Sequence, residues 1–344
     1  MYNVTMNRWL TSWMGVASLL ISTACGDDSQ PSGQTGTGGS AGAGAAGGGG
    51  SPEGGGGTGG DGGTAGSESP KLPPPDLGNW TGDAPIALVP STTPPGDLSA
   101  ADASHYGGLS CGPFPENLFD ILIPNLPGPV PLVVFIHGGG FVGGTRATSY
   151  SGPKAQHALD YLAAGFGYAT IDYRFRDALD EGVRTSLQDS QVCLQYIRYH
   201  AETLGIDPQR IVLTGGSAGA GTSLWLGTSD DLADPGSGHP ILSVSTQVRG
   251  VIIDATQATY DLLDWAPVVF APEYEELVQA AFDGGQIDDV LVSFYGISPD
   301  AMPSVVEFLA TDPIARDYRA AIDMLELMGP DDAPVWAQTT NADE

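Results

Sequence analysis

The segment from Arg210 to Leu226 decides the fold. It reads Arg210-Ile-Val-Leu-Thr214, a predicted strand, then Gly215-Gly-Ser-Ala-Gly219, a G-x-S-x-G pentapeptide, and then Ala220–Leu226, a run compatible with a helix. Glycines on both sides of the serine let the chain turn sharply between strand and helix. The turn lifts the hydroxyl above the sheet edge, where ligands bind in α/β folds. This context predicts a nucleophilic Ser217; a glycine turn that only packs a helix on a strand is the alternative.

A second glycine segment, His137-Gly-Gly-Gly140, directly follows the apolar run Pro131–Ile136. Hydrolysis of an acyl bond builds negative charge on the carbonyl oxygen, and the loss of one fixed N–H donor costs about 3 kcal/mol of transition-state stabilisation. A glycine loop offers backbone N–H groups that no side chain covers. Because this segment precedes the serine turn by about 80 residues, the pair predicts a site for acyl transfer.

Apolar runs and helical patterns alternate along the rest of the chain. Apolar residues recur at steps of three and four from Leu187 to Leu204, which predicts one face of a helix, and Gly205 is placed to end it. Strands separated by helix-length segments pair in parallel through crossover helices. We therefore expect an α/β fold with an open, mostly parallel sheet and helices on both faces. The other predicted strands are Asn117–Ile123, Pro131–Ile136, Tyr168–Tyr173, Gln247–Ile253 and Pro334–Gln338.

The composition divides the chain into three parts. Residues 1–25 read as a lipoprotein-type signal peptide, residues 26–75 as a linker rich in glycine and proline, and residues 76–344 as the folded domain. Residues 26–70 hold 20 glycines in 45 positions and no lysine or arginine. Such a stretch cannot bury enough apolar surface to offset its chain entropy. Short acidic helical pieces at about 255–333 predict a cap inserted over the sheet.

The first 25 residues predict export and a lipid anchor. Arg8 precedes the apolar run Trp13–Ile21, which is too short to cross a bilayer as a helix. Ser22-Thr-Ala-Cys25 resembles the bacterial lipobox, in which the cysteine is lipidated and becomes the mature N-terminus. We therefore expect a protein of the bacterial cell envelope that is anchored to a membrane through Cys25. A plain signal peptide with an incidental cysteine is the alternative.

Two further cysteines, Cys111 and Cys193, lie in the predicted domain. Export to an oxidising compartment permits a disulfide between them. Free cysteines are often buried as small apolar side chains, and we expect two separate buried thiols here.

The charge of the chain argues against one class of partner. The net charge is −29, and from Asp254 to Glu344 there are 19 acidic and two basic residues. Binding to a phosphate backbone needs clustered lysine and arginine, so nucleic acid is not expected as a partner. The acidic residues are explained by a solvated surface, with rejection of anionic substrates as the alternative. The oligomeric state stays open.

Four segments together carry a family resemblance. The glycine loop, the serine pentapeptide, Ile171-Asp-Tyr-Arg174 and Ile206-Asp-Pro-Gln-Arg210 resemble the hormone-sensitive-lipase-like and related carboxylesterases of the α/β-hydrolase superfamily. The resemblance extends from about Asn117 to Asp254 and is loose elsewhere. It implies hydrolysis of a small-molecule carboxylic ester through an acyl-enzyme intermediate. No metal or organic cofactor is expected, because no His/Cys/Asp cluster has the spacing of metal ligands.

The resemblance also implies roles for the residues that match. Ser217 would be the nucleophile, and the N–H groups of Gly139, Gly140 and Ala218 would form the oxyanion hole. His137 would shape the glycine loop and would not act as the general base. Gly216 departs from the pattern, since many lipase-like members carry Asp or Glu there, and it leaves the subfamily open.

The remaining members of a catalytic triad follow in the order acid, then histidine. Asp343 lies after the last predicted strand and is the candidate acid, with Glu344 as its substitute; a solvated acid near a chain end is the alternative reading. His239 is the one histidine after Ser217, in a turn-rich loop on the wrong side of that acid. We therefore expect an incomplete polypeptide that lacks its catalytic histidine and a further strand and helix, and that is nearly inactive.

Two other functions are compatible with parts of this pattern. A prolyl-type serine peptidase shares the serine pentapeptide, but the HGGG segment is typical of esterases and lipases. A non-catalytic, surface-anchored domain of the same fold that binds a ligand would explain the missing histidine, but it leaves the serine turn and the glycine loop unexplained.

Overall fold

The computed structural model describes residues 69–91, 94–176, 181–269, 272–298 and 304–338. The predicted signal peptide with Cys25, nearly all of the predicted linker, and Asp343 with Glu344 lie outside the described residues. Within the described part of the chain, every helix is too short or too polar to span a membrane.

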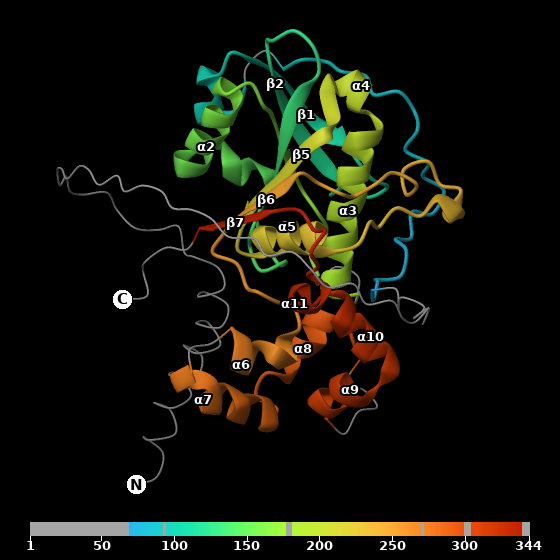
Figure 1. The fold of residues 1–344 in the computed structure, drawn as a ribbon, viewed down its shortest axis with the longest axis vertical. Helices are drawn as coiled ribbons and strands as arrows, with labels where there is room; N and C mark the ends of the chain where they lie inside the picture. Colours follow the sequence, from blue (N-terminus) through green and yellow to red (C-terminus); the bar gives the residue numbers. More distant parts are fainter. Residues whose placement is uncertain (1–68, 92–93, 177–180, 270–271, 299–303, 339–344) are drawn as a thin grey trace, which may run out of the picture. The chain divides into compact units, whose positions relative to one another are not determined.

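A seven-stranded sheet forms the centre of the described chain (Figure 1), in the order β1-β2-β4-β3-β5-β6-β7. The first two strands are antiparallel to their neighbours, and the pairs from β4 to β7 are all parallel. This confirms the expected open, mostly parallel α/β sheet. The strands are β1 (Ala103–Ser110), β2 (Leu118–Pro124), β3 (Val130–Ile136), β4 (Gly167–Ile171), β5 (Ile206–Gly216), β6 (Gly250–Asp254) and β7 (Val335–Gln338).

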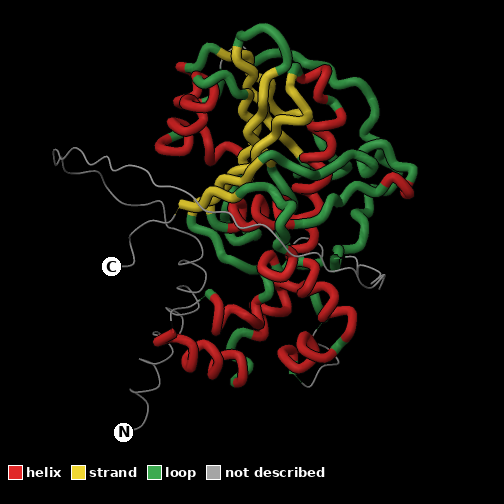
Figure 2. Tube along the Cα trace, in the orientation of Figure 1, coloured by secondary structure: helices red, strands yellow, loops and turns green. Residues whose placement is uncertain are grey.

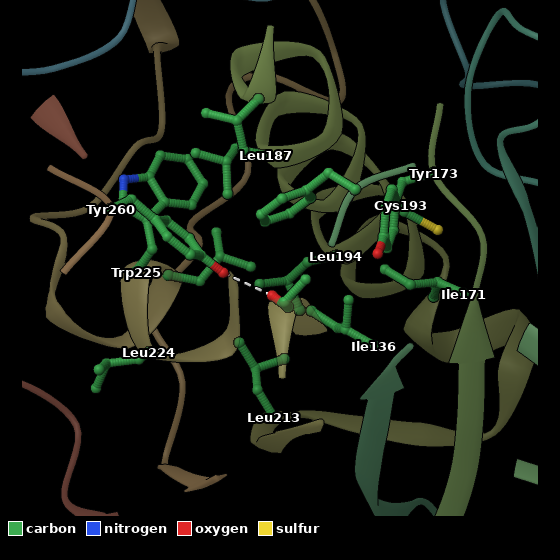
Figure 3. Packing of buried hydrophobic residues seen from close by; sticks show 14 of the residues in the cluster. Ile136, Ile171, Tyr173, Leu187, Cys193, Leu194, Leu213, Leu224, Trp225 and Tyr260 are labelled. Carbon is green, nitrogen blue, oxygen red and sulfur yellow. Dashed lines mark hydrogen bonds between the residues drawn. The ribbon is translucent and has the colours of Figure 1, made fainter. Parts of the chain in front are cut away.

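Helices cover both faces of this sheet. The side chains of β3 alternate between the faces: Val133 and Phe135 pack with α2 (Gly152–Ala163), while Leu132, Val134 and Ile136 join the larger core. That core also receives α3 (Val183–Tyr199) and α5 (Ala218–Thr228), as Figure 3 shows for some of its side chains. Every residue of α5 is buried, so this helix packs on all its sides.

The predicted strands all occur within a few residues of their expected bounds, and Gly205 ends α4 (Ala201–Leu204) in the left-handed conformation. One strand, β1, is not among those predicted. A glycine pair interrupts it, and the pairing register shifts between Tyr106 and Leu109, where Gly108 has φ +68°. This bulge breaks the alternation of apolar residues by which a strand is predicted.

A helical insertion, residues 262–327, lies between β6 and β7 in the sequence, where the sequence predicts a cap (Figures 1 and 2). Some of its acidic residues cap helices: the Asp312 carboxylate accepts the Ala315 N–H, and the Asp323 carboxylate accepts the Leu325 N–H. The insertion consists of α6 (Trp265–Val268), α7 (Pro272–Asp283), α8 (Asp288–Tyr295), α9 (Val305–Thr311), α10 (Pro313–Ala321) and α11 (Met324–Leu327), preceded by a 3-10 turn at Leu262–Asp264.

Cys111 and Cys193 form a disulfide, so the expectation of two separate thiols is wrong. Their Cα atoms are 4.9 Å apart although 82 residues separate them in sequence. The Asn117 side chain donates to the Asp189 carboxylate at 2.7 Å and thereby holds the β1–β2 connection against α3, one helical turn before Cys193. A contact between residues so far apart in sequence cannot be predicted from the spacing of the cysteines.

Removal of this cross-link should lower the free energy of unfolding by about 4.5 kcal/mol, the value expected for the closure of a loop of this length. The measurement is urea unfolding of the oxidised protein and of the double variant Cys111→Ser/Cys193→Ser. Dithiothreitol should destabilise the first and leave the second unchanged. Equal stability of the two proteins without reductant would contradict the prediction.

Candidate active site

Ser217 lies at the turn between β5 and α5, with φ 52° and ψ −126°. L-residues rarely adopt this conformation, and surrounding contacts must hold it in place. The Ser217 N–H donates to the Asp254 carbonyl at 3.1 Å, and the Ser217 carbonyl accepts the Gly221 N–H at 3.0 Å. The end of β6 and the first turn of α5 thus fix the strained residue from both sides.

Two of the pentapeptide glycines are required by close packing against β3. A Cβ at Gly219 would lie 2.0 Å from the Ile136 carbonyl oxygen, and one at Gly215 would lie 2.6 Å from the same atom. Gly216 differs, because a Cβ there would find its nearest neighbour, the Asp254 carbonyl oxygen, at 3.9 Å. The turn therefore has room for a side chain at position 216, and none at positions 215 and 219.

The glycine loop passes directly beside the serine. A Cβ at Gly138 would lie 3.3 Å from the Ser217 Cβ and 2.7 Å from the Gly216 carbonyl oxygen. The loop continues through positive φ values at Gly139 (117°), Gly140 (60°) and Phe141 (65°). The structure thus brings together the two segments that the sequence singles out.

The carbonyl groups of the loop fix the directions of its amides. The His137 imidazole donates from Nδ1 to the Gly138 carbonyl at 2.7 Å, and the Val142 N–H donates to the Gly139 carbonyl at 3.0 Å. Because C=O and N–H point in opposite directions across a trans peptide, the amides of Gly139 and Gly140 point away from these two donors. No acceptor among the described residues uses the N–H of Gly139, Gly140 or Ala218.

His137 is enclosed by the loop and by the strand end beside it. Its ring stacks on Tyr173 with 4.3 Å between centroids, and only 1% of the residue is exposed. Burial lowers the pKa of the imidazole, although the hydrogen bond to Gly138 and the charge of Asp172 act in the opposite direction. A neutral ring that donates to the Gly138 carbonyl stabilises the shape of the glycine loop.

The segment Ile171-Asp-Tyr-Arg174 supports the loop from behind. Asp172 pairs with Arg146, which also contacts Asp120 at 2.8 Å. The Tyr173 hydroxyl donates to the His137 carbonyl at 2.8 Å. Arg174 pairs with the buried Asp189 at 2.7 Å. Each polar residue of this segment therefore has a structural partner.

All five histidines of the chain lie within the described residues, and the hydrogen bonds and ion pairs of four of them join them to groups other than Ser217. His200 Nε2 donates to the Gly82 carbonyl at 2.8 Å, and His239 Nε2 donates to the Trp80 carbonyl at 2.7 Å. His105 Nε2 lies 3.9 Å from Asp120 Oδ2, and His157 is exposed on α2. The candidate acid Asp343 and its substitute Glu344 lie outside the described residues, so the acid and base positions stay predictions.

A cavity of about 280 Å³ lies on the α2 side of the sheet, and Ser217 does not line it. Its wall includes Lys154, His157, Gly216, Asp254 and Trp336. The cavity therefore lies behind the serine turn, on the face opposite α5.

Sequence reasoning missed one residue at this site. Tyr260, which follows β6, is 1% exposed and donates its hydroxyl hydrogen to the Ala218 carbonyl at 2.6 Å (Figure 3). An aromatic residue shortly after a strand is too common a pattern to single it out. The signal that could have found it is Gly221, a glycine inside a predicted helix with no turn to explain it.

The glycine packing gives a prediction with a matched control. Gly219→Ala should lower the free energy of unfolding by about 2–3 kcal/mol, since its Cβ meets the β3 backbone. Gly216→Ala should change it by less than about 1 kcal/mol, because that Cβ has space. The measurement is chemical unfolding of both variants. Equal losses in the two would contradict the packing at Gly219.

Parts of the chain are similar to known proteins. The BD-FAE family model matches residues 119–274. Juvenile hormone esterase of Tribolium castaneum is 30% identical over 107 residues, which are 30% of this chain and 18% of that protein. Gut esterase 1 of Caenorhabditis elegans is 24% identical over 324 residues, which are 72% of this chain and 54% of that protein. This chain therefore spans about half of the length of Gut esterase 1 and less than a fifth of the length of the juvenile hormone esterase.

Among solved structures, a truncated form of a carbohydrate esterase from gut microbiota matches with a TM-score of 0.48 and 17% identity, over 71% of this chain and 79% of that one. The sheet order and the strand–serine–helix turn carry the assignment of the fold. The described sheet and its strand–serine–helix turn have the arrangement of an α/β-hydrolase fold, and residues 119–274 match the BD-FAE family model.

Proposed function

We propose that the protein is a serine hydrolase that cleaves carboxylic esters through an acyl-enzyme. The observation that carries the proposal is the position of Ser217, held at a strained turn with the glycine loop beside it. The Ser217 Oγ forms a bond to the ester carbonyl carbon, and its proton passes to a base. The resulting oxyanion accepts hydrogen bonds from the amides of Gly139, Gly140 and Ala218.

The second half of the reaction returns the enzyme to its starting state. The tetrahedral intermediate expels the alcohol, which takes the proton from the base, and leaves the acyl group on Ser217. Water then attacks the acyl carbon by the same route and releases the carboxylic acid. Carboxylic esters are the proposed substrates because the matched relatives are named as esterases. A small-molecule ester is the proposed partner, and no step calls for a metal or organic cofactor.

The proposed reaction needs a base at Ser217, and the contacts of the histidines do not place one there. The hydrogen bonds of His137, His200 and His239 and the ion pair of His105 are made with groups other than Ser217. We propose that the 344-residue chain therefore reacts slowly at Ser217, since loss of a triad histidine lowers kcat by about 10⁶ in the best-studied case. Asp343 is proposed as the acid that would orient a histidine.

Imidazole should restore part of this reactivity, because a neutral imidazole in solution can accept the Ser217 proton as a general base. We expect slow labelling of Ser217 by a fluorophosphonate, which forms an Oγ–P bond and releases fluoride, and faster labelling with added imidazole. Intact-mass spectrometry and peptide mapping measure the rate and the site. The Ser217→Ala variant, which should not be labelled, is the control. The rate of p-nitrophenyl acetate hydrolysis, after subtraction of the rate of Ser217→Ala, should likewise be low without imidazole and higher with it.

The same assay distinguishes the rival functions. A folded protein whose Ser217 stays unlabelled at high imidazole would favour a non-catalytic binding domain, which the positions of the histidines also favour. Faster cleavage of prolyl dipeptide amides than of short-chain esters would favour a peptidase. Rapid turnover of p-nitrophenyl acetate without imidazole would show that a base is already present and would overturn the proposal of slow reaction.

We propose that the protein is exported and anchored through a lipid on Cys25, with residues 26–75 as a flexible linker. The support is the sequence Ser22-Thr-Ala-Cys25 after a short apolar run. In a bacterial host, the wild-type protein should sediment with membranes and incorporate labelled fatty acid. The Cys25→Ser variant should do neither, and an unchanged distribution would contradict the anchor.

A further inference from the structure

We infer that Tyr260 is a positioning residue that holds the two halves of the proposed oxyanion hole together. The inference rests on the proposed function, because it assigns Tyr260 a role at the same site. One half of the hole is the N–H of Ala218 at the start of α5. The other half is the glycine loop, which ends at Phe141. Tyr260 contacts both.

The contact with α5 is a short, buried hydrogen bond. The Tyr260 hydroxyl donates to the Ala218 carbonyl at 2.6 Å, and the Thr222 hydroxyl donates to the same oxygen at 2.9 Å. These two hydroxyl donors hold the Ala218–Gly219 peptide, which directly follows the peptide that carries the Ala218 N–H. Since Tyr260 is only 1% exposed, water cannot replace its hydroxyl without a rearrangement.

The sequence makes room for this hydroxyl at Gly221. A Cβ at Gly221 would lie 2.1 Å from the Tyr260 oxygen and 2.5 Å from the ring carbon that carries it. Glycine inside a helix costs about 1 kcal/mol relative to alanine. The close approach of Tyr260 explains why α5 has glycine at this position.

The contact with the glycine loop is made by the ring. The rings of Tyr260 and Phe141 meet edge-on with centroids 5.3 Å apart. Phe141 follows Gly140 directly, has φ +65°, and its carbonyl accepts the Arg176 N–H at 2.9 Å. The ring of Tyr260 therefore limits the movement of the residue that closes the loop.

Tyr260 is itself held by the helical insertion. Its N–H donates to the Ile322 carbonyl at 3.3 Å, and the preceding carbonyl, that of Ala321, accepts the indole N–H of Trp225 from α5 at 2.9 Å. The end of α10 is thus fastened to Tyr260 and to α5. Stabilisation of an oxyanion requires donors that are already in place when the charge develops, and these contacts supply that rigidity.

The test compares Tyr260→Phe with Tyr295→Phe. Both substitutions remove one hydroxyl from a buried ring, but the Tyr295 hydroxyl accepts the Leu262 N–H at 2.8 Å and lies within the insertion. With imidazole present, Tyr260→Phe should lower the maximal rate of Ser217 phosphonylation by about tenfold, the effect of a lost hydrogen bond of about 1.4 kcal/mol. The half-saturating probe concentration should change by less than about twofold. Tyr295→Phe should leave both values within about twofold of wild type.

Amide hydrogen exchange supplies a readout that does not depend on reactivity. Tyr260→Phe should speed exchange in peptides that cover Ala218–Thr222 and Gly139–Val142, and Tyr295→Phe should not. Gly221→Ala should give the same exchange pattern as Tyr260→Phe, and the two effects should not add in the double variant, because both disrupt one contact.

The outcomes separate the two proposals. If wild-type Ser217 is not labelled, the proposed function fails, and the exchange pattern alone decides the positioning role. If Ser217 is labelled and Tyr260→Phe matches Tyr295→Phe in both rate and exchange, the inference about Tyr260 is overturned. A change in the half-saturating concentration alone would also overturn it, since that would assign Tyr260 to binding of the probe.

Discussion

The parallel register of β3 and β5 pairs Ile136 with Gly215, and the geometry of the site depends on this pairing. The glycine loop leaves the sheet immediately after Ile136, and the serine turn leaves it immediately after Gly216. The two segments therefore meet because their strands end side by side. The absence of side chains at Gly215 and Gly219 then lets the turn approach the Ile136 carbonyl. A shift of one residue in the register would separate the loop from Ser217.

Much of this arrangement can be predicted from the sequence because it is local. Strands β2 to β7 are apolar runs, and the serine and glycine segments are short motifs whose context is the adjacent strand. The parts that could not be predicted are contacts between distant residues. The Cys111–Cys193 bond depends on how the β1–β2 connection packs on α3, and the Tyr260 hydrogen bond depends on a chain that returns over α5. Neither contact leaves a periodic pattern.

Polar groups near the site mainly serve to hold the backbone in place. The His137 ring and the Tyr173 hydroxyl bind carbonyls of the glycine loop, and the Tyr260 hydroxyl binds a carbonyl of α5. Because C=O and N–H point in opposite directions across a trans peptide, a hydrogen bond that fixes a carbonyl also fixes the N–H of the next residue. The surroundings of Ser217 are consistent with a site that is organised through its carbonyl groups.

The complete burial of α5 has a consequence for how such a protein can diversify. A helix that packs on every side tolerates few substitutions, because any change in volume disturbs the sheet or the insertion. The insertion has exposed apolar side chains such as Tyr274, Leu277 and Ile314, which can change at little cost to the core. Substitutions should therefore accumulate in the insertion, while the helix that follows Ser217 stays constant among descendants.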